Sequence, residues 1–434
     1  MRILLVNKFH YIKGGSETYY FSLAEGLRSL GHEVFFFSMK DERNVPCSEE
    51  EYFVSNIDYN DDGLIKKIRA GLTLVYSSEA KEKFEAVLQK VRPDVVHLNL
   101  VHRQITLSVL DAPSLKGIPV VFTSHDYILI CPCYTMVNGS NEVCDECLGG
   151  KFSSCVRNEC VKKSRTKSFL AFLEATYLKK HKSYQRIDRI IAPSRFMEAK
   201  LLEAGFPSKQ VVYMQNFINA RICEEAKKAT APRLPSRNIL YFGRLSAEKG
   251  LSTLLQAFSR TIESIGGDWK LVIAGTGPFL PEMKGLVEDL DISKSVMIVG
   301  YKTGNELAEL IEGACFTVLP SEWRENMPYS IIESFAKGTP AIGNSIGGIP
   351  ELIKDGETGF LAEAGSVDSL VRALLRAVDL SADEEAYAAM RKRCRSYVVE
   401  HCDPNEYVKS LVDLYEQLVG DKKVGTCGGR RERE

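Results

Sequence analysis

Short apolar runs alternate with helical segments along most of the chain, and this alternation restricts the fold more than any other feature. Ile3–Val6 predicts a buried strand, Lys13–Ser16 a turn, and Glu17–Leu30 a helix that ends at Gly31. Strands that alternate with helices pair in parallel, with helices on both faces of the sheet. The first half is therefore predicted to be a doubly wound α/β lobe, whose other strands are Val34–Phe37, Asp94–Leu98, Val120–Thr123 and Arg189–Ala192.

The alternation stops once and then begins again. Residues 219–236 contain Pro232 and Pro235 and mixed charge, which predicts a linker. Two Rossmann-like lobes are expected, residues 1–218 and 237–400, with a ligand cleft between them. A helix over 401–420 is expected to cross back to the first lobe, and 421–434 to form a flexible tail. The predicted strands of the second lobe are Ile239–Phe242, Trp269–Ala274, Val296–Val299, Phe316–Leu319, Ala341–Ile342 and Gly359–Leu361, and its predicted helices include Lys249–Ile262 and Ser330–Ala336.

Composition excludes several classes of protein. The chain has 434 residues, 44% of them hydrophobic and 26% charged, which is typical of a globular protein of two to three domains. Lys and Arg (56) nearly balance Asp and Glu (57), which argues against a dedicated nucleic-acid binder. The opening run MRILLVN is too short for a signal-peptide core, and no apolar run reaches about 20 residues. A cytoplasmic protein is expected, with contact to a membrane surface left open.

Two carboxylates stand eight residues apart at the start of a predicted helix. Glu325 lies in the loop after the predicted strand Phe316–Leu319, and Glu333 lies about one turn inside the following helix. Between them, free backbone N–H groups favour an anion. A phosphate site flanked by two acids that bind hydroxyl groups indicates a sugar nucleotide. The alternative is a pair of surface acids at a helix start, where Glu is common.

Two cations follow the first strand of the second lobe. Arg244 and Lys249 flank a tight turn between Gly243 and Gly250, so both can reach a diphosphate. The alternative is a solvated surface pair. Gly14-Gly15 forms the corresponding loop of the first lobe, where glycine allows a ligand to approach the backbone.

Taken in order, these motifs resemble the retaining glycosyltransferases of family four, which have the two-lobed GT-B fold. The similarity covers nearly the whole chain. The motifs that carry it are Gly14–Glu17, Pro93–His97, His125-Asp126, Gly243–Gly250, Gly275–Pro278, the Glu325…Glu333 pair, Gly338–Ala341 and Gly347–Glu351.

The resemblance implies roles for individual residues and a donor that is a nucleoside diphosphate sugar. Arg244 and Lys249 would bind the diphosphate, Glu333 the ribose and Glu325 the transferred sugar, while His125 would contact that sugar at the reaction centre. The metal-independent, retaining mechanism with front-face transfer is likewise implied by the resemblance. The implied donor site also includes Gly14, Gly15, Gly275, Met327, Pro328, Tyr329 and Ser330.

Three other features near these motifs have alternative interpretations. His125 follows a strand, where a histidine is often structural, and its strand-end position favours the site. His97 and His102 are weaker candidates for the acceptor side. Asp289-Leu290-Asp291 mimics a metal motif, but no strand precedes it, so no catalytic metal is expected.

An insertion at 131–160 contains six cysteines. Cys144, Cys147, Cys155 and Cys160 have spacings that fit a structural zinc site, with Cys131 or Cys133 as substitutes. Disulfides and an iron–sulfur cluster are the alternatives. A similar insertion occurs in some family members that build surface polysaccharides.

A basic segment follows the insertion. Residues 161–190 contain nine Lys and Arg against Glu174 and Asp188, interleaved with apolar residues. Such a helix can lie on an anionic membrane. The alternative is an ordinary lobe helix, which is favoured for Phe172 and Leu173.

The sequence therefore predicts a retaining glycosyltransferase that acts on a saccharide or lipid-linked acceptor in polysaccharide or glycolipid biosynthesis, with no nucleic-acid partner. One alternative is a sugar-nucleotide epimerase of the same fold. Another is a two-lobed binding protein without turnover.

Overall fold

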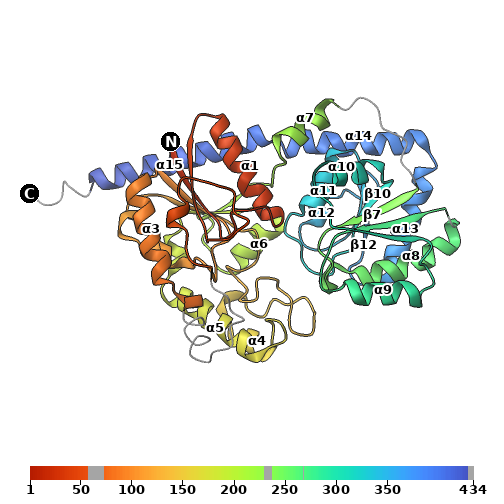
Figure 1. Ribbon diagram of the computed structural model, residues 1–434, viewed down its shortest axis with the longest axis horizontal. Coiled ribbons are helices and arrows are strands. Elements are labelled where there is room, and N and C mark those ends of the chain that lie inside the picture. The colour runs from red at the N-terminus through yellow and green to blue at the C-terminus, as the bar shows by residue number, and fades with distance from the viewer. Residues whose placement is uncertain (57–72, 229–236, 267, 429–434) are drawn as a thin grey trace, which may run out of the picture. The chain divides into compact units, whose positions relative to one another are not determined.

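A computed structural model of the chain describes residues 1–56, 73–228, 237–266 and 268–428. These residues form two compact units (Figure 1). Unit 1 is Met1–Met214 together with Pro404–Glu434, and unit 2 is Gln215–Asp403. Each unit is built on a six-stranded sheet in which the strands pair in parallel.

The sheet of unit 1 has the strand order β2-β1-β3-β4-β5-β6. Strand β1, the second in this order, pairs with both neighbours, since Leu4 lies opposite Phe35 of β2 and Val96 of β3. The strands are β1 (Arg2–Val6), β2 (Glu33–Phe37), β3 (Val95–Leu98), β4 (Val120–Thr123), β5 (Arg189–Ala192) and β6 (Val211–Tyr213). The helices are α1 (Gly15–Ser29), α3 (Ser78–Val91), α4 (Ser153–Arg157), α5 (Arg165–Lys180), α6 (Arg195–Glu203) and α15 (Pro404–Gly428).

Alternate strand residues of unit 1 point to opposite faces. Leu4 and Val6 pack in one core with Phe84 and Leu88 of α3. Helix α15, from the end of the chain, packs on α1. A Cβ at Gly26 of α1 would lie 2.7 Å from Cγ2 of Val408, so glycine is what allows this close approach.

The sheet of unit 2 has the order β12-β11-β10-β7-β8-β9. Its strands are β7 (Asn238–Phe242), β8 (Lys270–Ala274), β9 (Val296–Gly300), β10 (Phe316–Leu319), β11 (Ala341–Asn344) and β12 (Gly359–Ala362). Its helices are α7 (Ala220–Lys228), α8 (Leu251–Ile265), α9 (Leu280–Asp289), α10 (Gly304–Gly313), α11 (Tyr329–Ala336), α12 (Ile349–Leu352), α13 (Val367–Ser381) and α14 (Glu384–His401).

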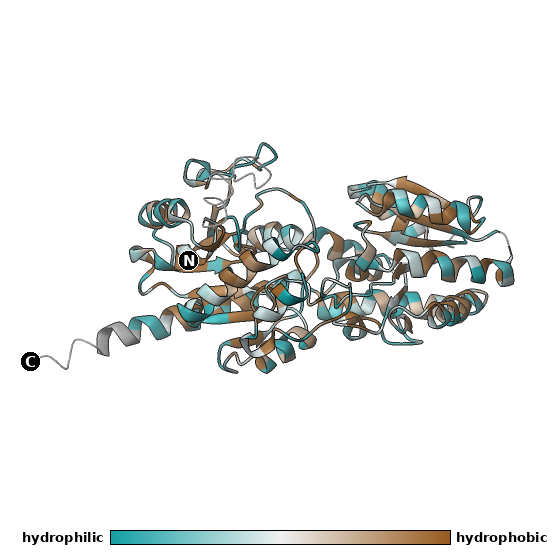
Figure 2. Cartoon of the chain, turned by 90° about the horizontal axis from the view of Figure 1, so that it is seen from below, coloured by the Kyte–Doolittle hydropathy of each residue, from teal (hydrophilic) through white to brown (hydrophobic). Residues whose placement is uncertain are grey.

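Helices cover both faces of the second sheet. Ile239 of β7 packs with Leu254 of α8 and Leu370 of α13, whereas its neighbour Leu240 faces the other side with Ile311 of α10. The strands are accordingly apolar on both faces, as their brown colour in Figure 2 shows. This is the packing of a doubly wound sheet.

The strand order fixes where each unit can bind a ligand. When the strands of unit 2 are numbered 1 to 6 along the chain, their order from β9 to β12 is 3-2-1-4-5-6. The strand order therefore reverses between β7 and β10. In unit 1 the reversal lies between β1 and β3. Loops that leave the carboxyl ends of the strands at such a reversal diverge and leave room for a ligand.

The predicted pair of parallel α/β lobes is confirmed, with three differences in detail. Strand β6 was not predicted, because Val211–Tyr213 is too short to show a period. Residues 220–228 of the predicted linker form helix α7, since Cys223 and Ala226 join the core of unit 2; residues 229–236 lie outside the described residues. Helix α15 continues to Gly428, beyond the predicted start of the tail.

None of the helices in the described ranges is both long and apolar enough to cross a membrane.

Candidate active site

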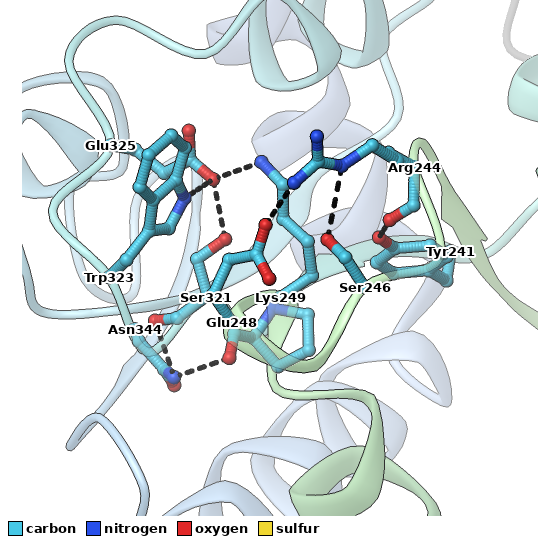
Figure 3. Close-up of polar contacts among 10 residues, drawn as sticks. Tyr241, Arg244, Ser246, Glu248, Lys249, Ser321, Trp323, Glu325 and Asn344 are labelled. Atoms are coloured by element: carbon cyan, nitrogen blue, oxygen red, sulfur yellow. Dashed lines mark hydrogen bonds and ion pairs between the residues drawn. The ribbon is translucent and has the colours of Figure 1, made fainter. Parts of the chain in front are cut away.

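The two loops at the strand reversal of unit 2 carry the predicted donor residues. The loop after β7 contains Arg244 and Lys249, and the loop after β10 contains Glu325 (Figure 3). Nζ of Lys249 lies 2.5 Å from Oε1 of Glu325. The two residues are 76 positions apart, so the topology of the sheet is what brings them together.

Glu325 is buried, with 7% of its surface exposed, and three donors converge on one of its oxygens. Besides Lys249, Oε1 accepts hydrogen bonds from Oγ of Ser321 (2.6 Å) and Nε1 of Trp323 (2.7 Å), as Figure 3 shows. The Lys249 ammonium also lies 5.1 Å from the centre of the Trp323 ring. One carboxylate oxygen of Glu325 therefore accepts from a cation and from two neutral donors.

Backbone contacts fix the loop that carries Glu325. Nδ2 of Asn344 donates to the carbonyls of Pro320 (2.8 Å) and Ser321 (3.0 Å). The backbone N–H of Gly348 donates to the Glu325 carbonyl at 2.7 Å. Gly250 has a φ of +69°, and a Cβ there would lie 2.0 Å from the Pro320 carbonyl oxygen, so this turn requires glycine.

Arg244 lies beside the pair and is more exposed. Its Nη2 contacts Oε1 of Glu248 closely, its Nε donates to Oγ of Ser246 (3.2 Å), and its carbonyl accepts from the Tyr241 hydroxyl (2.8 Å). Its side chain is 64% exposed. The guanidinium is therefore held at its base and free to exchange partners at its tip.

Gly275 serves the packing of two loops. A Cβ at this position would lie 1.9 Å from the Gly243 carbonyl oxygen, so the loops after β7 and β8 touch here. The same holds at Gly277, where a Cβ would lie 2.1 Å from the Leu245 carbonyl oxygen. The two glycines allow the loop after β8 to approach the loop that carries Arg244. This close packing is sufficient to explain why glycine occupies positions 275 and 277.

Helix α11 begins at Tyr329, one residue before the predicted start at Ser330. Pro328 is its N-cap, Tyr329 and Ser330 form its first turn, and Met327 is buried with 4% exposed. Burial raises the pKa of Glu333, one turn into the helix, to about 7. Part of the Glu333 population is therefore protonated near neutral pH.

In unit 1, the predicted residues lie at the carboxyl ends of the strands. Gly14 caps α1 in an extended conformation, and its carbonyl accepts from the N–H groups of Glu17 and Thr18. Gly15 is the first residue of that helix. Nε2 of His125, just after β4, lies 2.9 Å from Oδ1 of Asn99, just after β3.

The other two histidines are built into the core. His97 is fully buried, with Nδ1 2.5 Å from the Tyr415 hydroxyl and Nε2 2.7 Å from Oγ1 of Thr123. His102 is 6% exposed and lies 3.1 Å from the Tyr184 hydroxyl. Both rings have packing and hydrogen-bonding roles, in contrast to the acceptor-side role expected for them.

The predicted zinc site is not assembled. Among the residues described, no group of three or more His, Cys, Asp or Glu side chains is placed to hold a metal ion, so Cys144, Cys147, Cys155 and Cys160 do not form the expected ligand set. The thiols of the insertion hydrogen-bond to one another instead, with the Sγ atoms of Cys131 and Cys133 3.4 Å apart. Hydrogen bonds from Cys131 and Cys160 lower the pKa of the Cys133 thiol.

Helix α5 confirms only part of its predicted amphipathic pattern. Ser168, Ala171 and Leu178 are buried, as is Glu174, which lies 3.5 Å from Nε of Arg103. Leu173 was assigned to the core, but it is 38% exposed, and Phe169 is 47% exposed. The buried face of α5 therefore contains Glu174 and does not contain Leu173.

Sequence reasoning missed the partners that set the geometry of the pair. Ser321 and Trp323 stand four and two residues before Glu325, and their polar atoms gave no signal without the loop conformation. Glu248 and Ser246, which contact Arg244, lie between Arg244 and Lys249 in the sequence. From the sequence, this short loop indicated only a turn. Asn344, at the end of β11, had no sequence signal.

Two family models together match most of the chain. Residues 13–221 match the model described as Glycosyltransferase Family 4, and residues 223–397 match Glycosyl transferases group 1.

Two curated relatives match over shorter stretches. N-acetyl-alpha-D-glucosaminyl L-malate synthase of Bacillus anthracis is 28% identical over 246 residues, which is 56% of this chain and 62% of that protein. UDP-Gal:alpha-D-GlcNAc-diphosphoundecaprenol alpha-1,3-galactosyltransferase of Escherichia coli is 30% identical over 182 residues, 42% of this chain and 45% of that protein. The matches thus span less than two thirds of the length of these curated relatives.

Solved structures match the fold over a longer stretch. Anabaena Alr3699/HepE, crystallised in complex with UDP and glucose, superposes on 96% of this chain and 100% of its own, with a TM-score of 0.66 and 15% identity. At that identity the likeness concerns the GT-B fold, and it agrees with the two parallel sheets described above.

Proposed function

Because the chain belongs to the glycosyltransferases of family four, we propose that it transfers a sugar from a nucleoside diphosphate sugar to a saccharide acceptor, with retention of anomeric configuration. The observation that carries the proposal is the Lys249–Glu325 pair at the strand reversal of unit 2, with Arg244 beside it. A cation next to a hydrogen-bonding carboxylate suits a ligand with a diphosphate and a polyol.

Lys249 and Arg244 bind the diphosphate in this proposal. An ammonium has three N–H donors, and Glu325 occupies one, so two remain for phosphate oxygens. Arg244 exchanges its contact with Glu248 for the ligand. Both cations stabilise the negative charge that develops on the leaving diphosphate as the glycosidic bond breaks.

Glu325 binds the transferred sugar. Its Oε1 already receives three donors, which leaves Oε2 for a sugar hydroxyl. Glu333 accepts hydrogen bonds from the ribose, and the backbone from Met327 to Ser330 faces the phosphates. Within unit 1, we assign Gly14 and Gly15 to donor binding and His125 to contact with the reacting sugar. The leaving phosphate takes the acceptor proton in a front-face transfer.

The donor proposed first is a uridine diphosphate sugar, on the basis of the complex of the Anabaena protein with UDP and glucose. The acceptor proposed is a lipid-linked or growing saccharide, by analogy with the undecaprenol-linked acceptor named for the Escherichia coli relative. The exposed Phe169 and Leu173 and the basic residues at 161–190 support peripheral contact with the inner face of a membrane.

The cysteine-rich segment is given a structural role. We propose that this chain belongs to a subgroup of the family that carries such an insertion. A zinc ion would require the thiols to rearrange, because their present contacts pair Cys131 with Cys133. Elemental analysis of protein purified under reducing conditions measures whether such a rearranged zinc-bound form exists.

The test is a transfer assay with a panel of nucleoside diphosphate sugars. Each donor is mixed with lipid-linked saccharides extracted from a polysaccharide-producing bacterium, and both the released nucleotide and the glycosylated product are measured. We expect one donor to give product with retained configuration and Lys249→Met to abolish it. Conversion of a donor to its epimer without transfer would overturn the proposal in favour of an epimerase, and binding without turnover would favour a binding protein.

A further inference from the structure

The carboxyl ends of β1, β3 and β4 hold a buried polar chain that ends on His125. The backbone N–H of Asn99 donates to the Val6 carbonyl at 2.8 Å, and Nδ2 of the same residue lies 3.4 Å from that carbonyl oxygen. Oδ1 of Asn99 lies 2.9 Å from Nε2 of His125. Asn99 is fully buried, so its amide is not free to turn toward water.

These contacts define the orientation of the Asn99 amide. If the amide were flipped, its oxygen would face the Val6 carbonyl oxygen, and two buried acceptors would oppose each other. With Oδ1 toward His125, the proton of the neutral imidazole must lie on Nε2. The lone pair is then on Nδ1.

Neighbouring rings hold the imidazole in place. The Tyr19 ring lies edge-on to His125, with centroids 4.8 Å apart at 70°. The Tyr19 hydroxyl is itself held by Thr123 (3.2 Å) and by Tyr407 of α15 (2.8 Å). The His125 ring therefore has Asn99 as its hydrogen-bonding partner and Tyr19 as its packing partner, and both contacts resist its rotation.

Burial keeps the His125 imidazole neutral. Burial lowers the pKa of His125 to about 3, and it lowers the pKa of His97 to about 3 as well. Burial raises the pKa of Tyr19 to about 12, so that hydroxyl stays neutral. Asp126, the next residue, interacts with Lys8 from the loop after β1.

We propose that Asn99 is a positioning residue that fixes the Nε2-protonated tautomer of His125, so that Nδ1 accepts a hydrogen bond from a hydroxyl of the reacting sugars. This inference rests on the proposed function, because it takes His125 to lie at the reaction centre. It excludes a role for His125 as a cation that stabilises the leaving group.

The tautomer is measured without any activity assay. Protein labelled with ring-¹⁵N histidine contains seven histidines, and His125→Gln assigns the resonances of His125. We expect the ring shifts of a neutral, Nε2-protonated imidazole at pH 7. An Nδ1-protonated or charged ring would overturn the inference, whatever the enzyme does with donors.

Variants at position 99 test whether Nδ1 of His125 contacts a reacting sugar. Asn99→Asp keeps an acceptor for Nε2 and adds a charge, which raises the pKa of His125 so that the lone pair on Nδ1 is lost at a higher pH. At saturating donor, the ratio of Asn99→Asp to wild-type kcat is expected to fall at least fivefold from pH 8 to pH 6. Asn138→Asp, in a turn of the insertion where Oδ1 accepts from Ser140 and Glu142 N–H groups, is the matched control with a constant ratio.

Two further outcomes separate this inference from the proposed function. If His125→Gln transfers sugar at the wild-type rate, His125 has no place at the reaction centre and the inference is overturned, while transfer itself stands. If the Asn99→Asp ratio stays constant with pH although the NMR titration of His125 shifts upward, Nδ1 does not contact a reacting sugar. Loss of all transfer by the wild-type protein with every donor would instead count against the proposed function.

Discussion

Lys249 and Glu325 form an ion pair of 2.5 Å between two loops that leave adjacent strands at the point where the sheet of unit 2 reverses its strand order. Their side chains are 17% and 9% exposed, so both charges are largely removed from water. The pair thus has two roles in our proposal. It connects the loop after β7 to the loop after β10, and it presents a cation and a carboxylate oxygen to the donor.

Lys249→Met is expected to destabilise the protein by about 3 kcal/mol, because removal of one partner leaves a buried charge without compensation. The double variant Lys249→Met/Glu325→Gln is expected to recover part of that loss, since no buried charge remains. Urea unfolding measures both. The control is Lys302→Met, whose pair with Glu306 is on the surface and should contribute about 0.5 kcal/mol or less. Equal effects at the two lysines would show that the 2.5 Å pair does not form.

Arg244→Ala is expected to lower kcat/KM for transfer. The loss should correspond to about 2–4 kcal/mol of transition-state stabilisation, because the variant lacks a charge-assisted contact to the leaving group. Its stability should change by about 0.5 kcal/mol or less, since the side chain is 64% exposed. Steady-state kinetics and urea unfolding separate the two effects. Arg260→Ala, which removes another exposed guanidinium paired with Asp368, should leave both unchanged. Wild-type turnover in Arg244→Ala would remove this residue from the mechanism.

The fold was predictable because it depends on periodicity. Every predicted strand of unit 2 was located from its apolar run. Strands β7, β10 and β11 show the reason, since a strand buried on both faces has few polar residues. Strand β6, with three residues, and helix α7, with proline-rich sequence after it, lacked that signal. Short elements are fixed by tertiary contacts, which a single sequence does not display.

The candidate site was predictable only in its charged residues. Arg244, Lys249 and Glu325 have side chains whose chemistry suggests a ligand, but the sequence did not reveal that Lys249 and Glu325 bind each other. The role of Asn344 depends on two carbonyls from another strand end. The cysteines were misread because spacing along the chain does not specify which thiols meet after a loop folds.

Donor binding is expected to tighten as pH rises through about 7. Burial raises the pKa of Glu333 to about 7, so the carboxylate that accepts ribose hydrogen bonds forms only above that pH. Calorimetry with a nucleoside diphosphate sugar measures this, because the charge of its diphosphate is constant in this range. Glu333→Gln should give a weaker affinity that does not change between pH 6 and pH 8. A wild-type affinity independent of pH would contradict the placement of Glu333 on the ribose.

The same pKa shift has a consequence for stability with the opposite sign. The folded state holds a proton on Glu333 up to about pH 7, whereas the unfolded chain releases it near the ordinary value of 4.5. The free energy of unfolding should therefore decrease as pH rises from about 5 to 7. Glu333→Gln removes this contribution, and urea unfolding at several pH values compares the two proteins.

Transfer is expected to continue in the presence of a chelator. Lys249 and Arg244 supply the positive charge that a metal ion would supply to a diphosphate in other enzymes. The assay compares initial rates before and after dialysis against a chelator of divalent ions, followed by addition of magnesium or manganese. A rate that returns only with the added metal would show that the two cations are insufficient.

Tyr415→Phe is expected to lower the free energy of unfolding by about 1–3 kcal/mol, because it leaves Nδ1 of the fully buried His97 without the hydroxyl 2.5 Å away. The helix that carries Tyr415 comes from the end of the chain, and this bond joins it to the strand that precedes Asn99. Tyr301→Phe, at a ring that is 63% exposed, is the matched control and should change stability by about 0.5 kcal/mol or less. If the two variants unfold at the same urea concentration, the His97–Tyr415 bond contributes nothing net to stability, and α15 is held by its other contacts, among them the hydrogen bond between the Tyr407 and Tyr19 hydroxyls.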